Sequence, residues 1–315
     1  MNQIEYFKNF PMAKEIEIAG HFIYTSMKSF CQLDSFWNEC DIFYILYTAS
    51  VGIERLQKVL LVLAENNTDD DIAKLEKDLI THSHQDLQNR IKNRLGLSLN
   101  SNQNKFIAML TSFYKSCRYD RFTMGSAYEK EKELLIKFLS SGLNREIVAN
   151  SFFGNTPNDQ QFKKFYCKNL GSIARAYHSL ISSKAREQNI FTYELNYNSS
   201  AGKLFYPHYE DDAYYKLFEE EVLARKEYLL FLIQNADKTE CGKFIKSIPA
   251  LDLDEGLYNS YISTLVSGNL TLSEIDEITS EYDYEVTNKR ERLNTMDAIG
   301  NPLVIFEDSL DDFEC

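Results

Sequence analysis

Apolar residues return every three or four positions along most of the chain, which is the spacing of amphipathic α-helices. The clearest case is the stretch VGIERLQKVLLVLAE at residues 51–65. This spacing predicts helices over residues 12–33, 35–64, 68–96, 102–118, 126–141, 160–187, 213–234, 255–265 and 272–282. The stretch FTYELNY reads instead as a short extended segment. We therefore expect an all-α fold.

Residues that begin and end helices support some of these bounds. Thr68 is a good N-cap, the aspartates at 69–71 suit the positive end of a helix, and Gly96 is a natural stop. Thr271 and Glu274 have the spacing of a capping box. The segment 68–96 is accordingly predicted to be one continuous helix.

The composition is consistent with a helical, water-soluble protein. Hydrophobic residues make up 44% of the 315, which is enough for a sizeable core, and only 5 prolines and 12 glycines are present. The start of the chain lacks a basic region followed by an apolar run, and the longest apolar runs are too short to span a bilayer. We expect a cytoplasmic protein without a membrane partner.

The cysteines predict neither a disulfide framework nor a metal site. The six are scattered, and no CxxC pair or other ligand spacing occurs among them. Free thiols are the expectation, and no metal or other cofactor is predicted.

Charge divides the chain unevenly. The formal net charge is -13, yet the residues from Pro207 onward hold 25 acidic and 9 basic side chains, whereas the preceding 206 hold 22 and 25. Together with a loop-like stretch at 144–159, this predicts a helical bundle over 1–155. A second helical domain would follow over 156–290, basic and then acidic, and an acidic tail over 291–315.

Two histidines stand close together in THSHQDLQNRI. On a helix His82 and His84 would point about 200° apart, which argues against a metal pair. His82 would instead share a face with Asp78 and Asp86. Such a row could orient a general base, or it could be a polar cluster that joins helices.

Two arginines stand at the end of the predicted fourth helix in SFYKSCRYDRFTMGS. Arg118 and Arg121 would project from neighbouring positions and could hold an anion such as an RNA phosphate. The alternative is helix-end electrostatics, with Asp120 as a local salt-bridge partner. Elsewhere, Glu54 and Lys58 have the spacing of a surface ion pair.

The segment 160–186 contains basic residues and no acidic ones. The basic residues are Lys163, Lys164, Lys168, Arg175, Lys184 and Arg186, and aromatic residues lie between them. They could follow a nucleic-acid backbone, or they could dock the acidic last third of the same chain.

Four stretches resemble bacterial HEPN-like proteins in their order: GHFIYTSMKSF, VGIERLQKVLLVL, ITHSHQDLQNRI and FYKSCRYDRF. The resemblance covers about residues 20–125. It implies an all-α, homo-oligomeric, usually dimeric protein of an antiviral-defence or toxin–antitoxin system. Many members of the family are metal-independent ribonucleases.

The family's catalytic spacing, Arg followed after four to six residues by His, does not occur here. Either the chain resembles a non-catalytic branch of the family, or it assembles a site from separated residues, namely His82, His84, Asp86, Arg118 and Arg121. A histidine would move the proton of a ribose 2′-hydroxyl while arginine stabilises the phosphate. The resulting prediction is a component that acts on or senses RNA.

A non-enzymatic adaptor that oligomerises and binds a partner protein is the alternative. The tail FEDSLDDFEC mixes acidic and aromatic residues, as short docking segments do.

Overall fold

The protein is described by a computed structural model whose interpretable residues are 3–65, 74, 77–117, 124, 130–149, 154–192, 194–206, 214–284 and 286–306. Over these residues the expected all-α class is confirmed, with twelve α-helices and no strand. The described part of the FTYELNY stretch forms turns and irregular chain instead of an extended strand. No helix among the described residues is both long and apolar enough to cross a membrane.

The chain divides into two compact units, of which the first runs from Met1 to Phe218. Its helices are α1 (Gln3–Gln32), α2 (Glu39–Ala64), α4 (His84–Leu95), α5 (Ser101–Ser112), α6 (Lys130–Leu143), α7 (Gln160–Glu187) and α8 (Ser200–Phe205). A five-residue π-helix, η1 (Phe113–Cys117), continues α5, and α9 (Tyr214–Asn235) begins in this unit.

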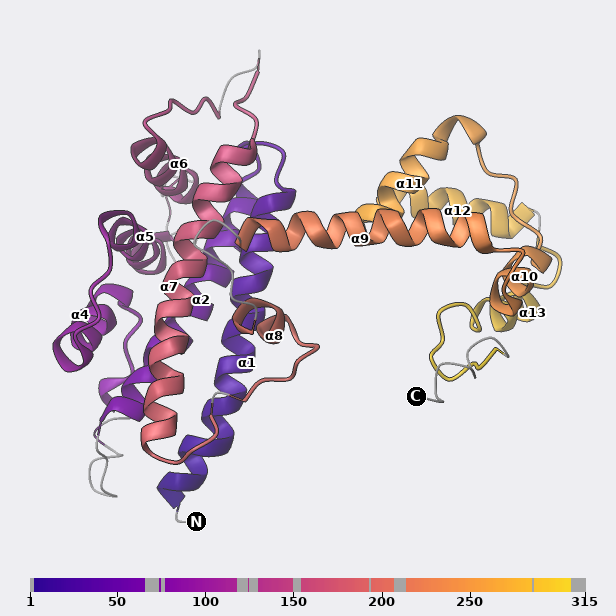
Figure 1. Ribbon diagram of the computed structural model, residues 1–315. Helices are drawn as coiled ribbons and strands as arrows, with labels where there is room; N and C mark the ends of the chain where they lie inside the picture. Colours follow the sequence, from indigo (N-terminus) through magenta and orange to yellow (C-terminus); the bar gives the residue numbers. More distant parts are fainter. Residues whose placement is uncertain are drawn as a thin grey trace. The chain divides into compact units, whose positions relative to one another are not determined.

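The core of unit 1 lies among its three long helices. Figure 1 shows α1, α2 and α7 side by side, with α4, α5 and α6 stacked along them. The residues from Val59 to Leu63 of α2 are all buried, because α1, α4 and α7 surround that helix. Gly52 permits the close approach of α1 and α2, since a Cβ atom there would lie 2.5 Å from Ile23 Cγ1.

The domain change expected near residue 155 is not found there, because α7 belongs to the first unit. Its apolar face, which includes Tyr166 and Tyr177, is buried in the same core as α1 and α2. The start of α9 also packs into unit 1, where the rings of Tyr24 and Phe218 lie 5.4 Å apart. The division falls after Phe218.

The continuous helix expected over 68–96 is also wrong. Residues 79–83 are not helical, and Ser83 is the N-cap of α4, where its side chain accepts a hydrogen bond from Asp86 N. The predicted stop is confirmed, since Gly96 caps α4 in the left-handed conformation with φ 73°. Thr68 and the aspartates at 69–71 lie outside the described residues.

The second unit runs from Glu219 to Cys315, and all regular secondary structure among its described residues is helical. It contains the rest of α9, then α10 (Glu240–Ser247), the 3₁₀-helix η3 (Glu255–Leu257), α11 (Tyr258–Ser267), α12 (Leu272–Tyr284) and α13 (Lys289–Met296). The capping box is confirmed at α12, where Glu274 Oε2 accepts from Thr271 N at 2.7 Å and Thr271 Oγ1 accepts from Glu274 N at 3.3 Å.

Unit 2 has no buried side chain among its described residues. Large apolar side chains of α9, such as Phe231 and Leu232, are about 60% exposed. The unit is also acidic, with 22 acidic and 8 basic residues in its sequence. The expected acidic tail over 291–315 begins within α13, and its residues from 307 onward lie outside the described part.

Candidate active site

A cavity of about 440 Å³ opens between α1, α2, the segment before α4, and η1. Its charged and imidazole side chains are Glu15, Glu54, Arg55, Lys58 and His82. Apolar side chains of α1 and α2 and the ring of the η1 tyrosine at 114 complete the wall. The size is within the range of pockets that hold small molecules.

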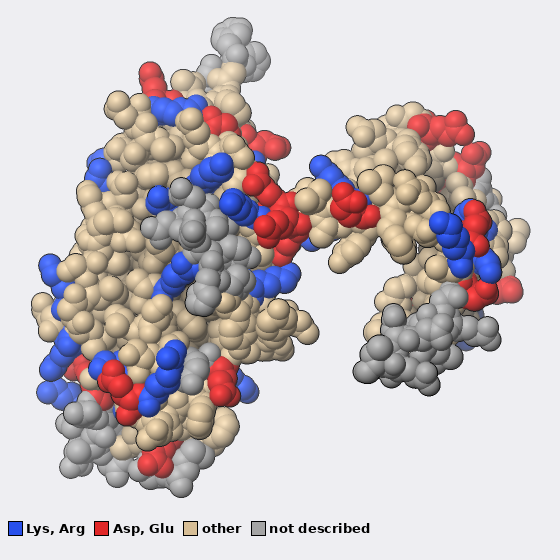
Figure 2. Space-filling view, viewed as in Figure 1, with Lys and Arg blue, Asp and Glu red and all other residues tan. Residues whose placement is uncertain are grey.

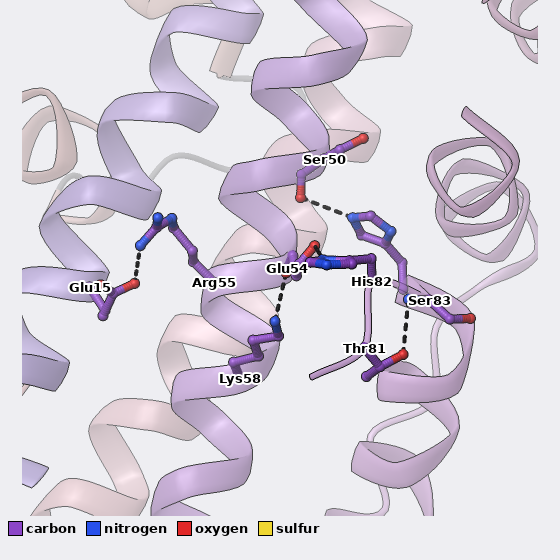
Figure 3. Close-up of polar contacts among 9 residues, drawn as sticks. Glu15, Ser50, Glu54, Arg55, Lys58, Thr81, His82 and Ser83 are labelled. Carbon is purple, nitrogen blue, oxygen red and sulfur yellow. Dashed lines mark hydrogen bonds and ion pairs between the residues drawn. The ribbon is translucent and has the colours of Figure 1, made fainter. Parts of the chain in front are cut away.

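Glu54 is the central acidic group of this cavity. It stands on the buried side of α2 and is only 9% exposed. Its carboxylate accepts from Lys58 Nζ at 2.7 Å, which confirms the ion pair expected from the i, i+4 spacing. The same carboxylate meets His82, 28 residues away in the sequence. Figure 3 shows Lys58 and His82 converging on it.

His82 is held on two sides and remains accessible. Its Nδ1 lies 3.1 and 3.2 Å from the two carboxylate oxygens of Glu54. Its ring stacks on that of Tyr114, with centroids 4.6 Å apart. The side chain is still 53% exposed. When Nδ1–H donates to Glu54, Nε2 is left with a lone pair that can accept a proton.

The π-helix η1 positions Tyr114. Phe113 and Cys117 of the same turn are buried, and together they fix η1 against the core. Single π-helical turns are frequent at functional sites because they redirect side chains relative to the α-helix they extend. Arg118 and Arg121 follow directly, but both lie outside the described residues.

A second ion pair lies beside this group. Arg55, the residue after Glu54, forms a close salt bridge with Glu15 of α1 (Figure 3). Both side chains are about one-third exposed. The cavity therefore contains carboxylates and cations in pairs, together with the imidazole of His82.

His84 has a different environment from His82. It is fully buried, and its Nε2–H donates to the carbonyl of Ser50 at 2.9 Å. Burial lowers the pKa of this imidazole, so the ring is neutral. Its own carbonyl accepts from Gln57 Nε2 at 3.0 Å. His84 thus joins α4 to α2 within the core and does not reach the cavity surface.

The expected row of Asp78, His82 and Asp86 on one helix face is not formed. His82 lies in the non-helical segment before α4, and its acidic partner comes from α2. Asp86 is exposed in the first turn of α4, where a carboxylate stabilises the helix N-terminus.

The basic residues of α7 meet aromatic rings as well as solvent. Arg175 lies 5.3 Å from the ring centre of Tyr214, and Lys164 lies 6.0 Å from that of Tyr215. Gly171 leaves room for this contact, since a Cβ atom there would lie 2.3 Å from Tyr214 Cδ2. These cations therefore fasten the start of α9, in part, by cation–π attraction.

The remaining basic positions on α7 differ in their exposure to solvent. Lys168 and Arg186 are exposed, Lys163 is half-buried, and Lys184 pairs with Glu187 at 2.6 Å. Figure 2 shows the Lys and Arg side chains of unit 1 scattered over the visible face instead of gathered into one patch. Their distribution does not define a single nucleic-acid track on that face.

The sequence did not reveal that Glu54 holds His82, or that the ring of Tyr114 stacks on the imidazole. The available signal was an acidic residue inside the strongly apolar stretch VGIERLQKVLLVLAE, because a carboxylate on a buried face needs partners. Within the described residues, no three His, Cys, Asp or Glu side chains are placed to bind a metal ion.

The arrangement of Glu54, His82 and Lys58 can perform acid–base chemistry. The carboxylate fixes one ring nitrogen, the other nitrogen can exchange a proton, and the ammonium supplies positive charge nearby. No protein-family model, curated protein or solved structure matches the chain.

Proposed function

We propose that the chain is a HEPN-like component of a bacterial defence or toxin-type system, and that it acts on RNA at the cavity beside His82. One observation carries the proposal: an exposed imidazole is held by a buried carboxylate at the edge of a cavity that also contains Lys58 and Arg55. The motif order over residues 20–125 supports the family resemblance.

The proposed chemistry is cleavage of RNA by its own 2′-hydroxyl. Glu54 accepts the Nδ1 hydrogen of His82, so that Nε2 removes the proton of the 2′-hydroxyl. The 2′-oxygen attacks the adjacent phosphorus and displaces the 5′-oxygen, which takes a proton back from the imidazolium. The products are a 2′,3′-cyclic phosphate and a 5′-hydroxyl, and no water is consumed in this step.

Cationic groups would stabilise the extra negative charge on phosphorus in the transition state. Lys58 is the described candidate, because its ammonium lies 2.7 Å from the same carboxylate that holds His82. Arg118 and Arg121 remain candidates on the strength of the resemblance and of their place just after η1. Lys163, Lys168 and the other basic residues of α7 would bind phosphates outside the cavity.

A cleavage assay with matched histidine variants tests the proposal. Labelled total RNA is incubated with the parent protein, with His82→Ala, and with His21→Ala as a control, since His21 is also exposed but lies elsewhere on α1. We expect cleavage by the parent and by His21→Ala, and a loss of about 100-fold or more in His82→Ala. Equal activity in the two variants would refute the assignment of His82.

Glu54→Gln separates the carboxylate's role from that of the imidazole. The amide keeps the size of the side chain but cannot carry the negative charge that stabilises an imidazolium. We expect a smaller loss than in His82→Ala, together with a changed pH profile of the remaining activity.

An adaptor function is the second candidate, favoured by unit 2. Its described helices bury no side chain and expose large apolar residues on α9, such as Phe231 and Ile233. Such surfaces mark interaction sites in soluble proteins. A parent protein that cleaves and binds no RNA, yet sediments as an assembly through unit 2, would favour this function over the ribonuclease.

A further inference from the structure

Two cysteines that are 136 positions apart in the sequence meet where α1 packs against α7. The Sγ atoms of Cys31 and Cys167 lie 3.6 Å apart, close enough for one thiol to donate a weak hydrogen bond to the other. We propose that Cys31 and Cys167 are a reversible oxidation site at which a hydroperoxide produces an intramolecular disulfide. This inference is independent of the proposed function.

The surrounding packing holds the two sulfurs together. Tyr166, the residue before Cys167, stacks on Phe30 with ring centroids 4.0 Å apart and an interplanar angle of 11°. Its hydroxyl also lies 2.8 Å from Ser26 Oγ. These contacts fix α7 against the last turns of α1. The sulfurs need to approach by only about 1.6 Å to reach the length of a disulfide bond.

The two thiols differ in accessibility, and this difference sets the order of events. Cys167 is fully buried, whereas Cys31 is partly exposed. Burial also raises the pKa of the Cys167 thiol, so its thiolate is scarce. A small oxidant from solvent therefore reacts first with Cys31.

The chemistry is balanced with hydrogen peroxide as the oxidant. The Cys31 thiolate attacks one peroxide oxygen, the O–O bond breaks, and the products are a sulfenic acid and, after protonation, one water. The sulfur of Cys167 then attacks the sulfenic sulfur, the S–O bond breaks, and the released hydroxide takes the Cys167 proton to form a second water. Two thiols lose two electrons in total, and the peroxide gains them. A thiol reductant reverses the change.

The bond would join the two ends of the segment 31–167. That segment contains α2, the His82 region, η1 and α6. A covalent link at its ends reduces the conformational freedom of the unfolded chain, so oxidation should stabilise unit 1.

Peptide mapping of the full chain tests the site. Reduced protein is treated with hydrogen peroxide, the remaining thiols are alkylated, and the digest is analysed by mass spectrometry. We expect a peptide pair that links Cys31 to Cys167, and its disappearance after dithiothreitol. Cys40→Ser is the matched control, because Cys40 is exposed and its removal should leave the link intact.

Two variants extend the test to the mechanism. In Cys167→Ser the sulfenic acid on Cys31 has lost the thiol that lies beside it, so dimedone should trap it in larger yield than in the parent protein. Oxidation should raise the melting temperature of the parent by roughly 5 to 10 °C and leave that of Cys31→Ser unchanged. The proposal is overturned if Cys31 and Cys167 are both still alkylated after Cys40 has been oxidised, or if the linked peptides join other cysteines.

Discussion

Acidification should weaken unit 1 through one histidine that the candidate site does not use. His178 lies on α7, and its ring stacks on that of Phe205 with centroids 4.3 Å apart. Its Nε2 is closed off from solvent and has no hydrogen-bond partner among the described residues. Burial lowers the pKa of this imidazole to about 4.

The direction of the effect follows from the lowered pKa. The unfolded chain has an ordinary histidine pKa of 6.5, so between pH 6.5 and pH 4 it binds a proton that the folded state does not bind. Stability is therefore retained above pH 6.5 and is lost as the pH falls toward 4. At pH 5 the loss from His178 is about 2 kcal/mol. His84 adds to it, since burial lowers its pKa as well.

Urea denaturation at pH 7.5 and at pH 5 measures this loss. Trp37 is the single tryptophan and lies in unit 1, so its fluorescence reports on that unit. His178→Phe keeps a ring beside Phe205 but removes the titrating nitrogen, and subtracting its pH response from that of the parent isolates the contribution of His178. We expect the parent to lose about 2 kcal/mol more than the variant.

Parallel pH responses of the parent and of His178→Phe would refute the reasoning, because they would mean that the imidazole is solvated or charged in the folded state. His21→Ala, at an exposed position of α1, controls for the removal of an imidazole elsewhere in unit 1. Unchanged denaturant slopes are required for the comparison to hold.

Two further substitutions test the packing of α7. Tyr177→Phe removes a buried hydroxyl that donates to Gln88 Oε1 at 2.6 Å and accepts from Gln57 Nε2 at 3.0 Å. The free energy of unfolding, measured by urea denaturation, should fall by roughly 1–3 kcal/mol. A change below the error of the fit would contradict the importance of these hydrogen bonds. Gly171→Ala places a methyl group where the ring of Tyr214 lies, which should loosen the start of α9. Limited proteolysis should therefore cut near the start of α9 faster than in the parent. Unchanged digestion would show that the ring moves away at no cost.

The extents of α2 and α7 could be predicted from the sequence because apolar residues return at helical spacing along both. The start of α1 could not, since that helix begins at Gln3 and continues through Pro11, whereas the expected helix began at residue 12. The bounds expected for α7, 160–187, agree with the structure, and those expected for α2 differ only at its start. In contrast, the stretch before α4 contains no glycine or proline that would signal a break in the helix. The break at 79–83 arises because Ser83 caps a new helix, and this local preference outweighs the helical pattern around it.

The candidate site could be predicted only in part, because its central contact is between distant residues. The histidines were recognisable as chemistry-bearing groups, but their different environments depend on where the helix breaks. His82 lies in the break and is exposed, whereas His84 begins α4 and is buried. The approach of His82 to Glu54 depends on how α4 packs against α2. The same reason explains the domain division, since the pattern of α7 shows that one face is buried but not which helices bury it.

The π-helix η1 makes the candidate site depend on chain length as well as on residue identity. A π-helical turn accommodates one more residue than an α-helical turn in the same rise. Loss of the codon for Phe113 would let α5 continue as an ordinary helix, and Tyr114, the next residue, would turn by about 100° around the helix axis. The aromatic support of His82 would then be lost without any substitution at the positions that form it.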